Sequence, residues 1–279
     1  MEFGIFSRTY SRPTLDGVLD AISAHGLSDV HFNLRSAGAP SLPDRIDEEL
    51  CARVLAAFQA RGFTMTSISG TFNAIHPDEQ ERRSGARRVC HLIERCRQLG
   101  ASTVTLCTGS RDPDDMWKRH PGNDLPDAWT DMRETLDRLL PAAEEHRVVL
   151  GIEPETNNVV NSAAKARKLL KEVDSPWLKI ILDGANLIEN ADFSEMARTL
   201  GEAFDLLGPD IAMIHAKDLA DPPSRPSQAA GKGALDWDTY CSLIQRHGKH
   251  VPVILHNLDE IEVPTSLAFV KDRLNHALL

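Results

Sequence analysis

The chain of 279 residues is 42% hydrophobic, enough for one large core, and its formal net charge of -10 disfavours the broad basic surface that nucleic-acid binding requires. Its five cysteines include no Cys-x-x-Cys pair, so neither a disulfide framework nor a zinc finger is expected, and a reducing cytoplasm is the expected compartment. The sequence contains neither a signal-peptide pattern nor an apolar run of membrane-spanning length, so we expect no membrane partner.

Short β-rich runs alternate with longer amphipathic stretches along the chain. The predicted strands are Phe3–Ser7, Val30–Leu34, Thr64–Ser69, Thr103–Thr108, Val148–Glu153, Lys179–Asp183, Ile211–His215 and Val253–His256. Helical periodicity is clearest in Asp44–Arg61, Asp78–Leu99, Ala128–His146 and Ser162–Val173. Eight strands alternating with helices predict a parallel sheet, either closed as a barrel or open and doubly wound. No linker-like composition divides the chain, so we expect one domain over residues 1–279.

Four successive strands in the second half of the chain each end in a carboxylate or an imidazole. These terminal residues are Glu153, Asp183, His215 and His256. Side chains alternate across a strand, and all four residues have the parity that points into a barrel. In an open sheet their tips would spread over roughly 14–15 Å, at a spacing of ~4.8 Å, whereas in a closed barrel they meet at the mouth that carries active sites. The sequence therefore favours an α/β fold with a single (β/α)8 TIM barrel.

Two carboxylates and two imidazoles form a suitable ligand set for one divalent metal ion. Such a set suits Mn²⁺, Co²⁺ or Zn²⁺, and carboxylates with water could also hold Mg²⁺. The alternative interpretation is that these residues lie at strand ends only because water is there. Four of them in register make that alternative the weaker one.

Motifs at these strand ends carry a resemblance to a known family. They are Gly151-Ile152-Glu153-Pro154-Glu155, Leu182-Asp183-Gly184-Ala185-Asn186, His215-Ala216-Lys217-Asp218 and Gly231-Lys232-Gly233-Ala234-Leu235-Asp236-Trp237. Together they resemble the xylose isomerase-like TIM-barrel superfamily, in particular its sugar phosphate isomerase/epimerase branch. The resemblance extends over nearly the whole chain and implies that Glu153, Asp183 and His215 are metal ligands.

The chain departs from the family pattern at two positions. Asn186 stands where the family commonly has a His three residues after the Asp, and His256 replaces the Glu of the last strand. In the family's epimerases two glutamates flank the sugar, and each contacts both the metal and a substrate proton. An imidazole that coordinates a metal through one nitrogen normally carries a hydrogen on the other, so it is then a donor and not a base. We therefore expect His256 to be a ligand or an acid/base, but not both.

The resemblance implies proton abstraction next to a carbonyl through an enediolate that a metal stabilises. Glu153, or its same-parity neighbour Glu155, is the expected base, and Lys217 could stabilise the oxyanion or donate a proton; the alternative for Lys217 is a surface salt bridge. The expected function is a metal-dependent isomerase or epimerase of a sugar, sugar phosphate or cyclitol. Loss of a β-hydroxyl would instead make a dehydratase, and a non-catalytic sugar-binding barrel is a third possibility. The apurinic endonucleases of the superfamily use more metal ligands and a basic surface, which this chain lacks.

Further residues are expected to bind a small polyhydroxylated substrate. They are Asn73, His76, Arg111 and Trp117, which follow the third and fourth strands, and Glu155 and Asn186 from the motifs above. Arg111 could bind a carboxylate or phosphate, and Trp117 could cover a sugar face. His31 has inward parity on the second strand, but a core histidine is its favoured interpretation. An aromatic content of only 5% favours a substrate of monosaccharide size, and a homodimer is one possible assembly.

Overall fold

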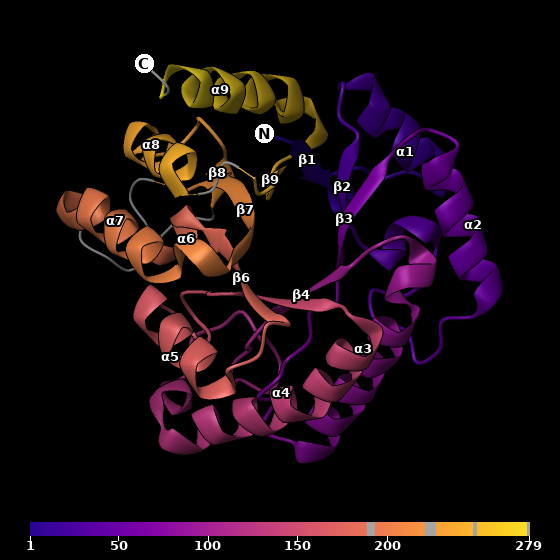
Figure 1. The fold of residues 1–279 in the computed structure, drawn as a ribbon, viewed down its shortest axis with the longest axis vertical. Coiled ribbons are helices and arrows are strands. Elements are labelled where there is room, and N and C mark those ends of the chain that lie inside the picture. Colours follow the sequence, from indigo (N-terminus) through magenta and orange to yellow (C-terminus); the bar gives the residue numbers. More distant parts are fainter. Residues whose placement is uncertain (189–192, 221–226, 248–249, 278–279) are drawn as a thin grey trace.

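Eight parallel strands form a closed ring that helices surround (Figure 1). The computed structural model describes residues 1–188, 193–220, 227–247 and 250–277. The ring consists of β1 (Phe3–Phe6), β2 (Asp29–Phe32), β3 (Thr64–Ser69), β4 (Thr103–Cys107), β5 (Val149–Glu153), β6 (Leu178–Asp183), β7 (Ile211–Asp218) and β9 (Val253–Leu255). Consecutive strands of this series pair in parallel, and β9 pairs with both β7 and β1, which closes the ring. The fold is thus a single (β/α)8 TIM barrel, as the sequence predicts.

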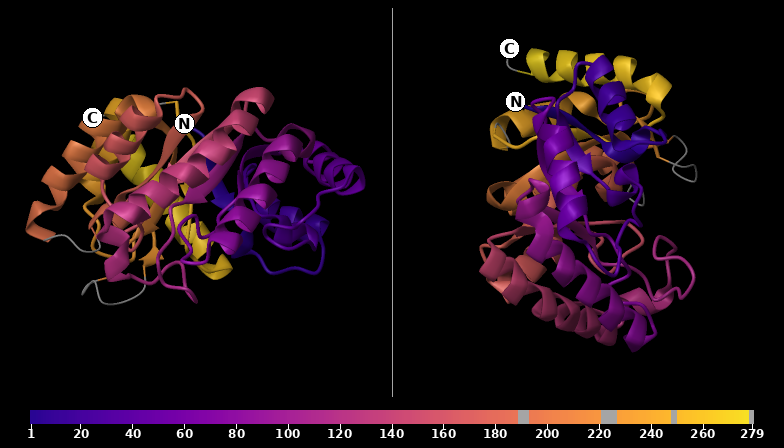
Figure 2. Two further views of the ribbon diagram at one scale, coloured as in Figure 1. Left: turned by 90° about the horizontal axis from the view of Figure 1, so that it is seen from below. Right: turned by 90° about the vertical axis from the view of Figure 1, so that its right-hand side faces the viewer.

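The helices lie outside the ring, as two further views also show (Figure 2). The longer ones are α1 (Leu15–Ala24), α2 (Glu48–Gln59), α3 (Glu79–Leu99), α4 (Pro126–His146), α5 (Ala163–Val173), α7 (Met196–Leu207), α8 (Trp237–His247) and α9 (Val263–His276), and α6 (Gly184–Ile188) is a short helix after β6. The stretch predicted from Asp44 begins only at Glu48, because the Asp47 side chain accepts a hydrogen bond from the Leu50 N–H and caps α2 there. Within the described ranges, no helix has the length and apolarity needed to cross a membrane.

The side chains two residues before the predicted site fill the barrel interior. Ile181, Met213 and Ile254 form a separate buried cluster, and they precede Asp183, His215 and His256 by one strand repeat. On β5 the equivalent residue is Gly151, where an added Cβ would lie 2.5 Å from Ile181 Cδ1. The inward parity expected for the four strand ends is therefore confirmed by the packing beneath them.

Strand β7 is longer than predicted and runs to Asp218. A two-residue strand, β8 (Gln228–Ala229), pairs with its end in antiparallel orientation. The buried Asp218 carboxylate accepts hydrogen bonds from the N–H groups of Leu219, Gly231 and Leu235 and from the indole of Trp237. These bonds hold the glycine-flanked motif, Gly231 to Trp237, against the end of β7. The motif therefore has a structural role.

Candidate metal centre and cavity at the barrel mouth

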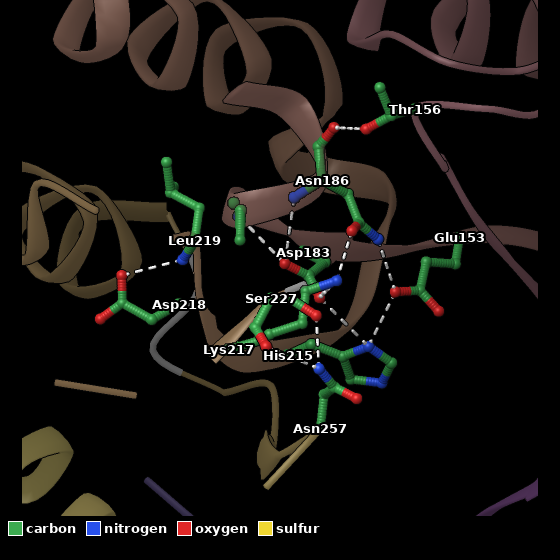
Figure 3. A network of polar contacts seen from close by, with 12 residues as sticks. Glu153, Thr156, Asp183, Asn186, His215, Lys217, Asp218, Leu219, Ser227 and Asn257 are labelled. Carbon is green, nitrogen blue, oxygen red and sulfur yellow. Dashed lines mark hydrogen bonds and ion pairs between the residues drawn. The ribbon is translucent and has the colours of Figure 1, made fainter. Parts of the chain in front are cut away.

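Three of the predicted ligands converge at the mouth of the barrel (Figure 3). Glu153 and Asp183 end β5 and β6, and His215 lies beside Asp183 on β7. Glu153, Asp183 and His215 are buried, and each offers one ligand atom within 4.8 Å of the other two. His215 Nδ1 lies 3.0 Å from Glu153 Oε1 and 3.9 Å from Asp183 Oδ2. Ligands about 2.0–2.2 Å from an ion lie within about 4 Å of one another, so small side-chain shifts would complete a site here.

The chemistry of this group fits a divalent cation. Asp183 Oδ1 accepts hydrogen bonds from the N–H groups of Ala185 and Asn186, at 3.0 and 3.3 Å. Asp183 Oδ2 is buried and has no hydrogen bond of ordinary geometry, although the Lys217 ammonium lies 3.2 Å away. A buried carboxylate oxygen beside a second carboxylate and an imidazole is a donor set typical of Mn²⁺, Co²⁺ or Zn²⁺ sites.

Lys217 and Asn186 link the two carboxylates. The Lys217 ammonium donates to Asn186 Oδ1, and Asn186 Nδ2 donates to Glu153 Oε1 at 3.0 Å. Burial alone would lower the pKa of Lys217, but the charges of Asp183 and the two nearby glutamates outweigh it and raise that pKa. Lys217 is therefore a buried, charged member of the site, and the alternative of a surface salt bridge is wrong.

Two neighbouring glutamates differ in their expected ionisation. Burial, followed by the charge of Glu153, raises the pKa of Glu155 to about 8. Burial alone would also raise the pKa of Glu153, but the charge and hydrogen bond of His215 outweigh it and lower that pKa. The two carboxyl groups offer ligand atoms within 4.8 Å of each other, in a group that includes Cys107. The pair thus combines an ionised carboxylate with one that exchanges its proton near neutral pH.

His256, the fourth predicted ligand, is not a member of the group formed by Glu153, Asp183 and His215. Its ring is stacked on that of His215, with centroids 4.3 Å apart and planes 5° apart. A metal bond to imidazole lies in the ring plane, and two stacked parallel rings share no plane, so both cannot coordinate one ion as they stand. His31 offers a nitrogen within 4.8 Å of a nitrogen of each of these two rings, and its ring centroid lies 5.8 Å from that of His215 and 6.2 Å from that of His256. His256 thus lies outside the group that Glu153 and Asp183 form.

His31 is buried as expected, yet it also lines the cavity. His31 Nε2 lies 3.1 Å from Thr105 Oγ1, whereas Nδ1 is buried without a hydrogen bond, as is Nδ1 of His256. Burial lowers the pKa values of both rings well below the ordinary value, and the charge of His215 adds to the effect. Phe6 packs on both, with centroid distances of 4.6 and 5.1 Å. Phe6 and two neutral imidazoles therefore form one wall of the site.

A cavity of about 360 Å³ opens at this mouth, a size suited to a small molecule. Glu153, Glu155 and His256 line it, and so does Trp117, which is 46% exposed. Sequence reasoning missed other lining residues, among them Phe6, Arg8, Ser69, Thr105 and Cys107. Ser69, Thr105 and Cys107 occupy the last inward positions of β3 and β4, so the parity argument applied to the first four strands would have found them.

Four of the predicted substrate-binding residues are not among those that line the cavity. One of them, Asn186, is instead bonded to Glu153 and Lys217. Asn73 Nδ2 donates to Ser110 O at 2.8 Å, and His76 Nε2 lies 3.0 Å from Pro113 O. Arg111 forms an ion pair with Asp131 of α4 at 2.6 Å and donates to a backbone carbonyl. The contacts of Asn73, His76 and Arg111 hold the loops after β3 and β4 together, so these contacts are a structural explanation for the three side chains.

Comparisons with known proteins agree with this architecture. No curated protein sequence matches the chain. The structure is similar to that of 3-keto-D-glucoside 4-epimerase YcjR from E. coli in its apo form (TM-score 0.75, 19% identity, 98% of this chain and 99% of that one). It is also similar to an L-ribulose 3-epimerase (TM-score 0.76, 17% identity, 99% and 96%) and to the probable 3-DHS dehydratase AsbF from Bacillus anthracis (TM-score 0.74, 13% identity, 97% and 99%). At these identities the likeness concerns the fold. The model of the xylose isomerase-like TIM barrel matches residues 19–271, and the chain belongs to that family.

Proposed function

We propose that the protein is a divalent-metal-dependent isomerase or epimerase of a monosaccharide-sized substrate, acting by proton transfer next to a carbonyl. The observation that carries the proposal is the convergence of Glu153, Asp183 and His215 beside a cavity that Glu155 also lines. The similar solved structures include two sugar epimerases, which supports a sugar as the substrate class.

In this proposal Glu153, Asp183 and His215 hold the ion, which is Mn²⁺, Co²⁺, Zn²⁺ or Mg²⁺. When bound, the ion would polarise a carbonyl and the neighbouring hydroxyl of the substrate. Asn186 keeps Glu153 oriented through its 3.0 Å hydrogen bond, and the Lys217 ammonium balances the buried carboxylate charge.

Glu155 is the proposed proton-transfer group. Its carboxyl group lies in the cavity, and a pKa of about 8 allows it to accept a proton and return it near neutral pH. If the Glu155 carboxyl group returns the proton to the neighbouring carbon on the same face, the reaction is that of an aldose–ketose isomerase. This reaction needs no second proton-transfer group.

An epimerase is the second candidate. Such an enzyme needs a second proton-transfer group on the opposite face of the substrate. The unpartnered Nδ1 of His256 favours this possibility, since a neutral imidazole that is not a metal ligand can take a proton from one face while the protonated Glu155 carboxyl group gives one to the other.

Metal analysis and deuterium exchange from solvent into pentoses and hexoses test the proposal. We expect Glu155→Gln to abolish exchange while keeping the metal, and Glu153→Gln to lose both. Exchange that survives in Glu155→Gln contradicts the role of Glu155. Protein that binds metal but exchanges no proton, with or without release of an unsaturated product, contradicts the isomerase assignment.

A further inference from the structure

Arg8 is a cation at the cavity for which the described residues offer no counter-ion. It lies in the short turn Ser7–Thr9 that follows β1, its side chain is exposed, and it lines the cavity. Its backbone is fixed by Ser7, a fully buried neighbour whose hydroxyl accepts hydrogen bonds from the Asn33 N–H and the Ser36 hydroxyl. The chain has 41 acidic and 31 basic residues, so acidic partners are abundant. None of those described is bonded to Arg8.

Three other cations, Arg12, Arg111 and Lys217, each pair with a carboxylate. Arg12 forms an ion pair with Glu260 at 2.6 Å, and Arg111, the anion-binding residue that the sequence suggested, is paired with Asp131. Lys217 is buried against Asp183. Among the charged residues lining the cavity, Arg8 is thus the cation available to a ligand.

The barrel places Arg8 across the cavity from the acidic residues. In the ring of eight strands β1 is four strands away from β5 in either direction, so their ends lie on opposite walls. Glu153 ends β5, and Arg8 follows β1. Phe6 and the neutral rings of His31 and His256 lie on the side of Arg8, which leaves its guanidinium as the charged group of that wall.

We propose that Arg8 binds an anionic group, a carboxylate or a phosphate, at the end of the substrate that is remote from the reacting carbon. A guanidinium presents paired N–H donors that match both anions, and Asn33 and Ser41 line the same side of the cavity and offer further polar contacts. The position of the reacting carbon rests on the proposed function, whereas the anion site itself does not. The substrate class would accordingly be a sugar acid or a sugar phosphate, not a neutral sugar.

Inert polyols test this proposal without turnover. The probes are D-glucitol, D-gluconate and D-glucitol 6-phosphate, which are neutral, carboxylated and phosphorylated and carry no aldehyde or ketone group. Dissociation constants are measured by calorimetry for the wild-type protein, for Arg8→Gln and for a matched control, Arg35→Gln. Arg35 is exposed in the segment Leu34–Ala37 that follows β2, but it does not line the cavity. Each titration is run on the protein as purified and after EDTA treatment, because a carboxylate also binds metal ions directly.

We expect the wild-type protein and Arg35→Gln to bind at least one anionic probe about tenfold or more tightly than D-glucitol, in line with charge-assisted hydrogen bonds. Arg8→Gln should lose this preference and keep its affinity for D-glucitol. The anion with the larger loss identifies carboxylate or phosphate as the natural group. The proposal is wrong if neither anion is preferred, if the preference survives in Arg8→Gln, or if Arg35→Gln loses it equally. Metal content and solvent exchange report on the proposed function separately, so each idea can fail alone.

Discussion

The imidazole of His256 lies face to face with that of His215, 4.3 Å away and nearly parallel to it. The family resemblance implies that the side chain at the end of the last strand both binds the metal and contacts a substrate proton, whereas the proposed function gives His256 only the second of these roles. His215 faces the carboxylates through Nδ1, while His256 keeps an unpartnered Nδ1. The consequences can be measured.

Removal of His256 should leave metal binding nearly intact. The His256 ring is stacked on the proposed ligand His215 and does not belong to the group of Glu153, Asp183 and His215. His256→Ala should therefore change the metal dissociation constant by less than about threefold, below the roughly 10–100-fold effect of losing a residue that hydrogen-bonds to a metal ligand. His256→Glu should tighten metal binding, since it adds a carboxylate where the family has one. Competition titration with a chromogenic chelator measures both. Loss of the metal from His256→Ala would show that the ring turns and coordinates.

Replacement of Lys217 by Met should destabilise the metal-free protein by about 3–5 kcal/mol, because it leaves buried carboxylates without their cation. Urea unfolding in EDTA measures this loss. Added metal should restore part of it in Lys217→Met, since a divalent ion also neutralises Glu153 and Asp183. Lys232→Met is the control, because Lys232 forms a more exposed ion pair with Glu262 and should cost less than about 1 kcal/mol. Equal losses in the two variants would contradict the assigned role of Lys217.

Acid should remove the stabilisation that Asp210 provides. Burial works against ionisation of Asp210, but hydrogen bonds from Lys179 and Arg167 and their charges outweigh it and lower its pKa. A carboxyl group with a lowered folded-state pKa stabilises the protein above its unfolded-state pKa of about 3.9, and this contribution is lost as the pH falls through the folded-state value.

Asp210→Asn should therefore be less stable than the wild-type protein at pH 7, by about 1–2 kcal/mol, with the difference shrinking below about pH 4. Urea unfolding at several pH values tests this. Asp205→Asn, at an exposed position on α7, is the control and should show no such pH dependence. A difference that grows in acid would reverse the assigned sign.

Gly151 should not tolerate a side chain, because a Cβ there would lie 2.5 Å from Ile181 Cδ1 inside the barrel. Gly151→Ala should cost about 1–3 kcal/mol in the free energy of unfolding, and Ile181→Val, which removes that methyl group, should recover part of the loss in the double variant. Gly201→Ala is the matched control. It lies in α7 with open space around it, so the change should stabilise the helix by up to about 1 kcal/mol.

Much of the fold and part of the site follow from local patterns in the sequence. Alternating strand and helix periodicities predicted a parallel sheet, the four strand-end residues favoured its closure into a barrel, and the strands were located to within a few residues. Strand parity then brought Glu153, Asp183 and His215 to one mouth. This works because the direction of a Cα–Cβ bond is set by the backbone of the strand itself, and a closed ring brings all strand ends together.

Side-chain direction and loop path were decided by tertiary contacts. The stack of His256 on His215 depends on torsion angles that Phe6 and His31 constrain from other strands. Arg111 forms an ion pair with Asp131 of α4, whereas Arg8, which belongs to none of the sequence motifs, lines the cavity. The sequence thus determined which residues reach the mouth of the barrel. Only packing between distant elements decided which of them face the cavity and which pair with one another, because those choices depend on neighbours that sequence distance does not reveal.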